Sequence, residues 1–187
     1  MTRNLPHLLT NRLILRFPDP SEAAAICTFQ RENEPFLAQW EALKDTDYFT
    51  EPYWQTKIEQ NIEDFYNGKS CCLTIYAQNN RTIMGMVNYS NIIRGAFHSC
   101  FLGFKIGEAY QQQGYMTEAL RGSLDYVFSV LNLHRISANY MPCNLASARV
   151  LEKCRFEMDG VAKNYLYING KWENHVLTSL LNEAWIH

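Results

Sequence analysis

The sequence lacks any apolar run of the length that a membrane-spanning helix needs, which is about 20 residues. It also lacks a basic excess, because 17 lysines and arginines face 19 aspartates and glutamates and leave a formal net charge of -2. A dedicated nucleic-acid-binding protein usually carries a clear excess of positive charge. The sequence therefore predicts a protein without a membrane partner and without a requirement for direct nucleic-acid binding.

Patterns typical of metal sites and disulfides are missing as well. The 6 cysteines include no Cys-x-x-Cys pair, and no histidine cluster stands near them at zinc-site spacing. We therefore expect no metal, and we interpret the cysteines as reduced, packed thiols of a cytoplasmic protein. Residues 1–10 contain no long apolar stretch, which argues against a signal peptide.

The chain does contain enough apolar residues for a core. Its 187 residues are 47% hydrophobic, which predicts a single domain over residues 1–187. Alternating apolar patterns predict strands at residues 12–17, 70–77, 82–93, 97–106, 135–141, 156–167 and 171–181. Helical spacing predicts helices at residues 23–31, 36–43, 51–67, 117–131 and 144–153.

The order of these segments predicts an α+β fold, with helices on the faces of a mixed sheet. The strand, helix and strand between residues 97 and 141 predict one parallel pair joined by a crossover. The other neighbouring strands have short connections, and Asn169-Gly170 is a strong hairpin signal. Gly85 is expected to form a bulge in its strand.

Residues 111–117, Gln-Gln-Gln-Gly-Tyr-Met-Thr, connect an expected strand to an expected helix. Backbone N–H groups at such a junction are unpaired and lie at the positive end of the helix dipole. This arrangement suits phosphate or pyrophosphate. A glutamine-rich segment before a helix is also often only a turn, so the loop by itself leaves both interpretations open.

Six further motifs extend along nearly the whole chain. They are RLILR at 12–16, GFKI at 103–106, QQQGYMTEAL at 111–120, NYMPCNLAS at 139–147, LEKCRFEMDG at 151–160 and YINGKWENHV at 167–176. Together they resemble the GNAT acetyltransferase superfamily, and more narrowly its RimJ/RimL group. The resemblance implies the acyl-CoA N-acyltransferase fold, a single three-layer α/β/α domain, and transfer of an acetyl group from acetyl-CoA to an amine.

Residues 36–41, 88–98 and 163–166 are most similar to the RimJ-type members of this group. That resemblance implies the N-terminal alanine of a small-subunit ribosomal protein as acceptor. The residues then expected to bind the acceptor are Phe36, Trp40, Glu41, Tyr89, Asn91 and Arg94. Simple helix packing remains an alternative for Trp40 and Glu41.

The resemblance also implies which residues bind acetyl-CoA: Phe104, Lys105, Ile106, Gln111, Gln112, Gln113, Gly114, Tyr115, Met116, Thr117, Asn144 and Ser147. The backbone of 112–117 would hold the pyrophosphate. The end of the strand at 104–106 would pair with the pantetheine if it diverges from the strand at 135–141. Asn144 binds the pantetheine, caps its helix, or does both.

The resemblance implies that Ser147 protonates the CoA thiolate; its alternative is a serine without a catalytic role. The usual acid and base positions of the family are both apolar here, since Leu151 replaces a common tyrosine acid and Leu166 replaces a carboxylate base of RimL-type relatives. Arg155 stands where glycine is usual, so that turn is expected to differ locally. His98 is a candidate base, with a structural histidine as the alternative.

The missing carboxylate base favours one class of acceptor. An α-amine has a pKa of about 7.7–8.0, so roughly a tenth of it is neutral near pH 7, whereas a lysine is neutral less than about one time in a thousand. An enzyme without a strong base therefore suits an N-terminal amine better than a lysine side chain. Two alternatives remain: a polyamine, antibiotic or free amino acid as acceptor, and a non-catalytic protein that binds CoA or the ribosome.

Overall fold

The computed structural model describes residues 4–186, so residues 1–3 and 187 of the expected domain lie outside it. One 8-stranded sheet has the order β1-β2-β3-β4-β5-β6-β8-β7. The strands are β1 (His7–Leu9), β2 (Leu13–Arg16), β3 (Cys71–Ala77), β4 (Ile83–Ile93), β5 (Ser99–Ile106), β6 (Arg135–Tyr140), β7 (Glu157–Ile168) and β8 (Lys171–Leu181). The helices are α1 (Ala23–Leu37), α2 (Glu51–Tyr66), α3 (Tyr115–Ser129) and α4 (Leu145–Lys153), with short 3₁₀ turns at Pro20–Glu22, Ala38–Trp40, Thr46–Phe49 and Glu108–Tyr110.

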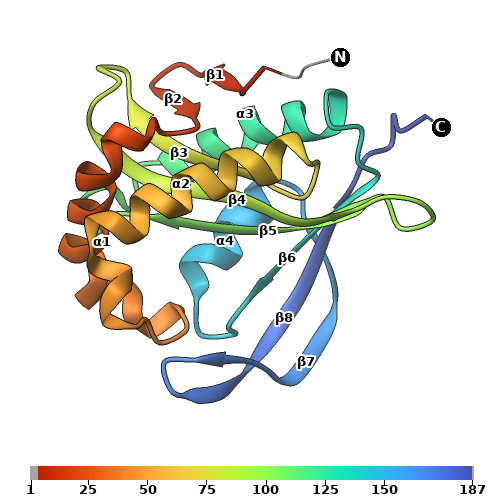
Figure 1. Ribbon diagram of the computed structural model, residues 1–187. Helices are drawn as coiled ribbons and strands as arrows, with labels where there is room; N and C mark the ends of the chain where they lie inside the picture. The colour runs from red at the N-terminus through yellow and green to blue at the C-terminus, as the bar shows by residue number, and fades with distance from the viewer. Residues whose placement is uncertain (1–3, 187) are drawn as a thin grey trace.

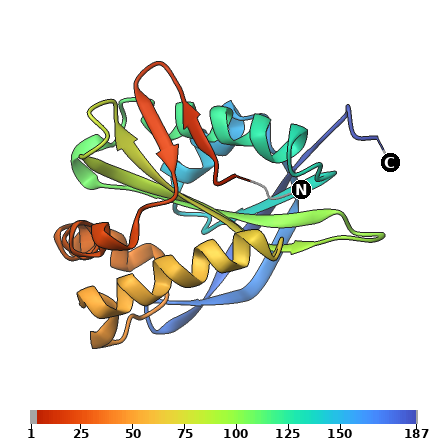
Figure 2. The ribbon, with the colours of Figure 1, turned by 45° about the horizontal axis from the view of Figure 1, so that its top comes forward.

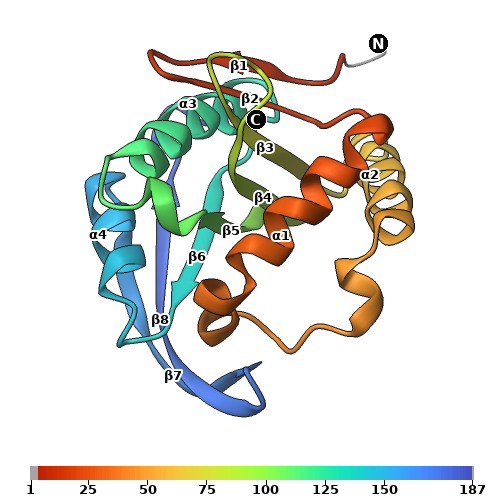
Figure 3. The same ribbon diagram turned by 90° about the vertical axis from the view of Figure 1, so that its left-hand side faces the viewer.

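Helices cover both faces of the sheet (Figures 1 and 3). The first pair, α1 and α2, packs against β4 and β3, while α3 packs against β1, β2 and β4 and α4 packs against β6. The larger core fills the space under α3, where Leu120 and Ile136 are fully buried. A second cluster under α1 and α2 includes Ile26 and Ile58. The expected three-layer arrangement with a mixed sheet is confirmed.

The parallel pair of β5 and β6 is short. It runs from Ser99 opposite Arg135 to Leu102 opposite Ala138 and then stops, although β5 continues to Ile106. The other edge of β5 stays paired with β4 up to Ile106. The expected divergence of these strands is therefore confirmed, and the last four residues of β5 have an open edge toward β6.

Gly85 fits the close approach of β4 to its neighbours. The register between β3 and β4 shifts at this point, which confirms the expected bulge. A Cβ atom at Gly85 would collide with the carbonyl oxygen of Lys105 on β5. This position therefore has no room for a side chain, so only glycine fits there.

Three expected boundaries were wrong. The sequence analysis placed no strand in residues 1–10, whereas His7–Leu9 pairs with β2 and extends the sheet. Pro35 does not end α1, which continues to Leu37 because that side chain is buried, at 6% exposed. The helix α3 begins at Tyr115 rather than residue 117, because Gly114, with φ 78, turns the chain directly into it.

The turn after α4 keeps a left-handed residue despite the loss of glycine. Arg155 has φ 64, and its N–H donates to the carbonyl of Glu152 at 2.9 Å. Arg155 thus adopts the left-handed conformation that glycine favours, and a local difference from the family turn stays a prediction. Non-glycine residues are strained in this conformation because Cβ approaches the following carbonyl oxygen.

Replacing Arg155 with glycine should therefore stabilise the protein. We expect the free energy of unfolding to rise by about 0.5–1 kcal/mol, since relief of the strain outweighs the greater freedom of glycine in the unfolded chain. Thermal denaturation should show a melting temperature raised by about 1–4 °C. Arg155→Ala is the control and should bring no such gain, because alanine keeps the Cβ atom; equal stabilisation by both variants would contradict the explanation.

Candidate active site

A cleft of about 1140 Å³ opens where β5 and β6 diverge. It extends from the loop before α3, past the start of α4, to the α1 side of the sheet. Fourteen residues singled out by the sequence line it: Phe36, Trp40, Glu41, Phe104, Lys105, Ile106, Gln111, Gln112, Gly114, Tyr115, Met116, Thr117, Asn144 and Ser147. The structure thus brings most of the predicted site residues together.

The loop before α3 presents free backbone donors. Gln112 and Gly114 both have left-handed backbones, with φ 57 and 78, and no side chain caps the helix. The first bond of the helix runs from the N–H of Glu118 to the carbonyl of Gly114 at 3.0 Å. The N–H groups of residues 115–117 precede that bond and have no partner within the helix. This concave backbone with a helix dipole behind it is chemically suited to an anion.

Arg12 holds this loop from the side (Figure 2 shows the β1–β2 hairpin beside α3). Its guanidinium donates to the carbonyl of Gln113 at 3.0 Å and to the Glu118 carboxylate at 2.6 Å, and it lies 4.3 Å from the centroid of the Tyr115 ring. Glu118 also accepts from Thr10 Oγ1 at 2.7 Å. The RLILR motif contained Arg12, but its role as a positioning residue was not inferred from the sequence.

The pKa of Glu118 reflects these contacts. Partial burial raises it, but hydrogen bonds from Thr10 and Arg12 and the charge of Arg12 outweigh burial and hold the pKa below its ordinary value. Glu118 is therefore an anchor for the loop as well as a carboxylate favoured by the helix dipole.

The first turn of α4 faces the cleft. Asn144 caps this helix, since its Oδ1 accepts the N–H of Ser147 at 3.0 Å, which confirms the capping interpretation. Ser147 is half-buried, and its hydroxyl makes no hydrogen bond to any residue between 4 and 186. That hydroxyl is free to donate into the cleft, at the positive end of the helix dipole.

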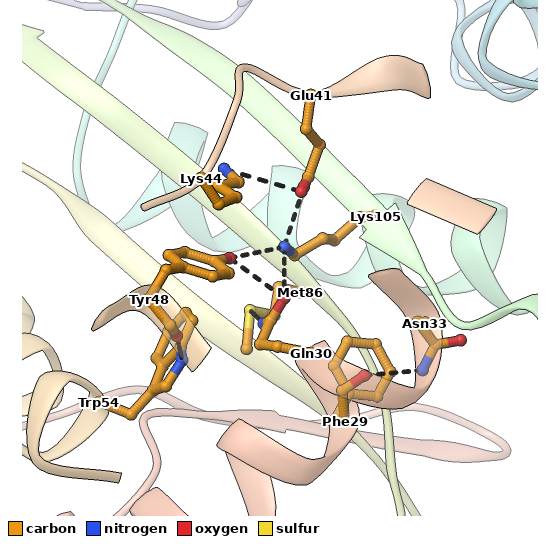
Figure 4. Close-up of polar contacts among 9 residues, drawn as sticks. All are labelled: Phe29, Gln30, Asn33, Glu41, Lys44, Tyr48, Trp54, Met86 and Lys105. Carbon is orange, nitrogen blue, oxygen red and sulfur yellow. Dashed lines mark hydrogen bonds and ion pairs between the residues drawn. The ribbon is translucent and has the colours of Figure 1, made fainter. Parts of the chain in front are cut away.

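On the α1 side, a buried ammonium organises the cleft wall (Figure 4). Lys105 Nζ lies 2.7 Å from Gln30 Oε1, 2.9 Å from Glu41 Oε1 and 3.1 Å from the hydroxyl of Tyr48. A second lysine, Lys44, stands 3.7 Å from the other oxygen of Glu41. Burial lowers the pKa of Lys105, and the Glu41 charge opposes that effect.

The sequence linked Lys105 to the site only through its backbone. Its side chain joins residues 57 to 75 positions away in sequence, a clustering that no local pattern encodes. Burial also raises the pKa of Tyr48, so its hydroxyl stays neutral and donates to Gln30.

A hydrogen bond spans the acceptor side of the cleft. The N–H of Asn169, in the turn between β7 and β8, donates to the carbonyl of Glu41 at 3.0 Å. Cleft-lining residues stand on both sides of this bond, Trp40 and Lys44 in one segment and Leu166 and Ile168 in the other. This bond therefore joins the β7–β8 hairpin to the segment after α1, and Figure 1 shows the two segments near one another at its lower left.

Four predicted site residues do not line the cleft in the way expected. Tyr89 is fully buried, and its hydroxyl bonds to Ser123 at 2.8 Å in the core under α3, so its assignment to acceptor binding was wrong. Asn91 belongs to the last part of β4, and Arg94 and His98 lie in the connection between β4 and β5, before the first residue of β5.

His98 lies far from the cleft along the direction of β5. His98 precedes Phe104 by six residues, which corresponds to about 20 Å of strand. Its ring contacts Trp185 at 5.1 Å instead, and Arg94 donates to the carbonyl of Asn132 at 3.2 Å. The structure does not place Asn91, Arg94 and His98 in the cleft lining, so their roles as base and acceptor contacts remain predictions. Gln113 also lies outside the cleft lining and contributes its carbonyl to Arg12.

Among residues 4–186 no helix is both long and apolar enough to cross a membrane. Nor do the described side chains contain three or more histidine, cysteine or acidic groups arranged to hold a metal ion.

Known proteins resemble the chain over almost its full length. A family model for an acetyltransferase (GNAT) domain matches residues 12–157. The ribosomal protein uS5-alanine N-acetyltransferase of Escherichia coli strain K12 is 36% identical over 184 residues, which are 97% of this chain and 95% of that protein. A ribosomal-protein-S5-alanine acetyltransferase structure from Vibrio fischeri superposes with a TM-score of 0.93 at 35% identity, covering 97% of this chain and 100% of the other.

A more distant solved structure shares the fold. Mycobacterium smegmatis RimJ, in complex with CoA-disulfide, has a TM-score of 0.87 at 24% identity, and the match covers 98% of this chain and 89% of the other.

The ion pair between Arg12 and Glu118, beside the loop before α3, should make the stability of the protein depend on pH. Glu118→Gln should lower the free energy of unfolding at pH 7 by about 1 kcal/mol, the range for a partly exposed pair with charged hydrogen bonds. Because the folded pKa of Glu118 lies below its ordinary 4.5, the contribution is complete above pH 4.5 and is lost as the pH falls through the folded pKa. Urea unfolding of both proteins between pH 7 and pH 3 should show the difference shrink in that window.

Glu108→Gln is the matched control, because Glu108 is an exposed acid in the preceding turn. This variant should leave the pH dependence of the free energy of unfolding the same as in the wild type. If the difference in the free energy of unfolding between the wild type and Glu118→Gln stayed constant down to pH 3, the role given to the Arg12–Glu118 ion pair would be contradicted.

Proposed function

The chain belongs to the GNAT acetyltransferase family, and we propose that it transfers the acetyl group of acetyl-CoA to the N-terminal alanine of ribosomal protein uS5. The single observation that carries the catalytic part is the cleft between the diverging strands β5 and β6, with an uncapped helix at one end. The acceptor is supported by the E. coli relative, which bears that activity in its name. We place this reaction in the cytoplasm and assign it to one domain.

The residues around the cleft fit acetyl-CoA. The free N–H groups of the loop before α3 bind its pyrophosphate, and Gly114 leaves room for it because the nearest described side-chain atom to a Cβ there would be Arg12, 3.6 Å away. The open edge of β5 at residues 103–106 pairs with the pantetheine amides. The M. smegmatis fold neighbour is in complex with CoA-disulfide, which supports a CoA derivative as the ligand of this fold.

The same strand end stabilises the charge that develops during transfer. A backbone N–H between Phe104 and Ile106 donates to the thioester oxygen as it becomes negative. One such donor is worth about 2.7–4 kcal/mol in enzymes of known mechanism. Ser147, with its free hydroxyl at the start of α4, returns a proton to the departing thiolate.

The acceptor lies on the α1 side of the sheet, against Phe36, Trp40 and Glu41. A polyamine is disfavoured there, because the Glu41 carboxylate is already paired with Lys105 and Lys44. A polypeptide brings only one amine, which reacts in its uncharged form, whereas a polyamine brings further positive charges close to these two lysines.

A peptide assay tests the acceptor directly. A peptide that begins with the uS5 alanine should gain one acetyl group at its α-amine when incubated with the protein and acetyl-CoA, as read by mass spectrometry. The same peptide with a blocked α-amine and a free lysine should gain none at pH 7, because the lysine is neutral less than about one time in a thousand. Robust acetylation of spermidine with no peptide product would refute the proposed acceptor.

Ser147→Ala tests the proton donor. We expect kcat to fall by about a hundredfold, the lower end for loss of a general acid, with the Kd for acetyl-CoA changed less than about twofold. Steady-state kinetics and isothermal titration separate the two quantities. Ser129→Ala, at an exposed serine at the end of α3, should change neither. Full turnover by Ser147→Ala would remove the catalytic role of this serine.

A further inference from the structure

His175 on β8 is a buried histidine whose side chain reaches the cleft. It is 3% exposed and belongs to the cleft lining. Its Nδ1 lies 3.1 Å from the carbonyl oxygen of Glu173. A carbonyl can only accept, so Nδ1 carries the proton and Nε2 holds the lone pair. No described residue donates a hydrogen bond to Nε2.

The register of the sheet places His175 beside the proposed point of reaction. Val176 pairs with Tyr140, the last residue of β6, so His175 stands just past the end of that strand. Leu177 pairs with Asn139, and His175 shares their face of the sheet because side chains alternate along a strand.

The same alternation relates this face to β5. Leu102 pairs with Ala138, and both belong to the core under α3. Lys105 and Asn139 are each an odd number of residues further on, so both point to the opposite face. His175 therefore lies on the acceptor face, with Lys105 and Asn139.

Neighbouring side chains hold the imidazole in place. The Tyr165 ring on β7 lies 5.7 Å from the His175 ring, and Asn139 Nδ2 donates to the Tyr165 hydroxyl at 3.4 Å. Leu166 and Ile168 supply apolar surface in the same part of the cleft. The acid nearest in sequence, Glu173, is paired with Lys171 at 2.8 Å.

The other ionisable groups of the acceptor side are less suited to accept a proton. Glu41 is engaged by Lys105 and Lys44. Lys105 is a buried donor with three acceptors, and the Tyr48 hydroxyl accepts from it. The imidazole of His175 remains as a group with an unused lone pair, in the part of the cleft where the carboxylate base of RimL-type relatives is replaced by Leu166.

We propose that Nε2 of His175 is the general base that removes a proton from the α-ammonium of the acceptor. This inference rests on the proposed function. One N–H bond of the ammonium breaks, the proton moves to Nε2, and the freed nitrogen lone pair forms a bond to the thioester carbonyl carbon. The C–S bond then breaks, its electron pair leaves with sulfur, and the thiolate takes a proton. Ser147 supplies the proton of the thiolate and is reprotonated by the second proton of the attacking nitrogen, and the imidazolium releases its own proton to water.

His175→Gln keeps a polar side chain and removes the base. At pH 7 we expect kcat/KM for the alanine peptide to fall about tenfold or more, because only about a tenth of the α-amine is neutral without help. At pH 9 the gap should narrow to about twofold or less, since the amine is then neutral in solution. Imidazole added to His175→Ala should restore part of the rate at pH 7. The Kd for acetyl-CoA should remain within about twofold of the wild type.

Controls separate this role from a structural one. His7→Gln makes the same change at an exposed position on β1 and should leave the rates unchanged. The proposal would be overturned if His175→Gln lowered kcat/KM by the same factor at pH 7 and pH 9, or if it lowered kcat/KM at neither pH.

The acceptor and the base can fail separately. If the wild type acetylates no N-terminal peptide but does acetylate a small amine, the proposed acceptor is wrong. The ratio of kcat/KM between His175→Gln and the wild type, measured with that amine at pH 7 and pH 9, then still decides whether His175 is the base.

Discussion

The divergence of two parallel strands is the constraint on which the rest of this molecule depends. Strands β5 and β6 pair over only four positions, from Ser99–Arg135 to Leu102–Ala138. A backbone edge at the middle of a sheet normally has a partner, since unpaired buried groups are costly. Here the partner is missing where the cleft lies, so the edge is available to a ligand that offers amide groups of its own. Antiparallel pairing with β4 keeps that edge straight up to Ile106.

The two ends of the cleft are built on different physical principles. Toward α3, the chain leaves backbone N–H groups uncapped and fixes their direction with Arg12 and Glu118. Toward α1, a buried Lys105 has its charge satisfied by Gln30, Glu41 and Tyr48. The first end is suited to charge brought by a ligand, while the second is already neutralised internally. This difference orients a molecule with an anionic end and an uncharged reactive end.

Local signals in the sequence predicted much of the fold, because they act over a few residues. The Asn169-Gly170 turn, the Asn144 cap and the Gly85 bulge each depend on one or two side chains and were confirmed. The continuation of α1 past Pro35 was missed because it depends on the burial of Leu37, a tertiary effect.

The family motifs predicted most of the cleft lining, including Phe36, Trp40 and Glu41, but they did not single out His175 as a site residue. His98 and His175 both lie next to apolar residues in strand segments, and nothing in their neighbours separates them. Only the length of β5 shows that His98 is far from the cleft, and only the register of β8 places His175 in it. Similarly, Tyr89 was expected to bind the acceptor, whereas its burial and its bond to Ser123 place it in the core.

The hydrogen bond from Asn169 to Glu41 couples the shape of the cleft to two segments that are far apart in sequence. It joins the β7–β8 hairpin to the segment after α1, and both segments contribute residues to the cleft lining. A shift of either segment is therefore transmitted to the other, so this side of the cleft responds as one unit rather than as two independent walls.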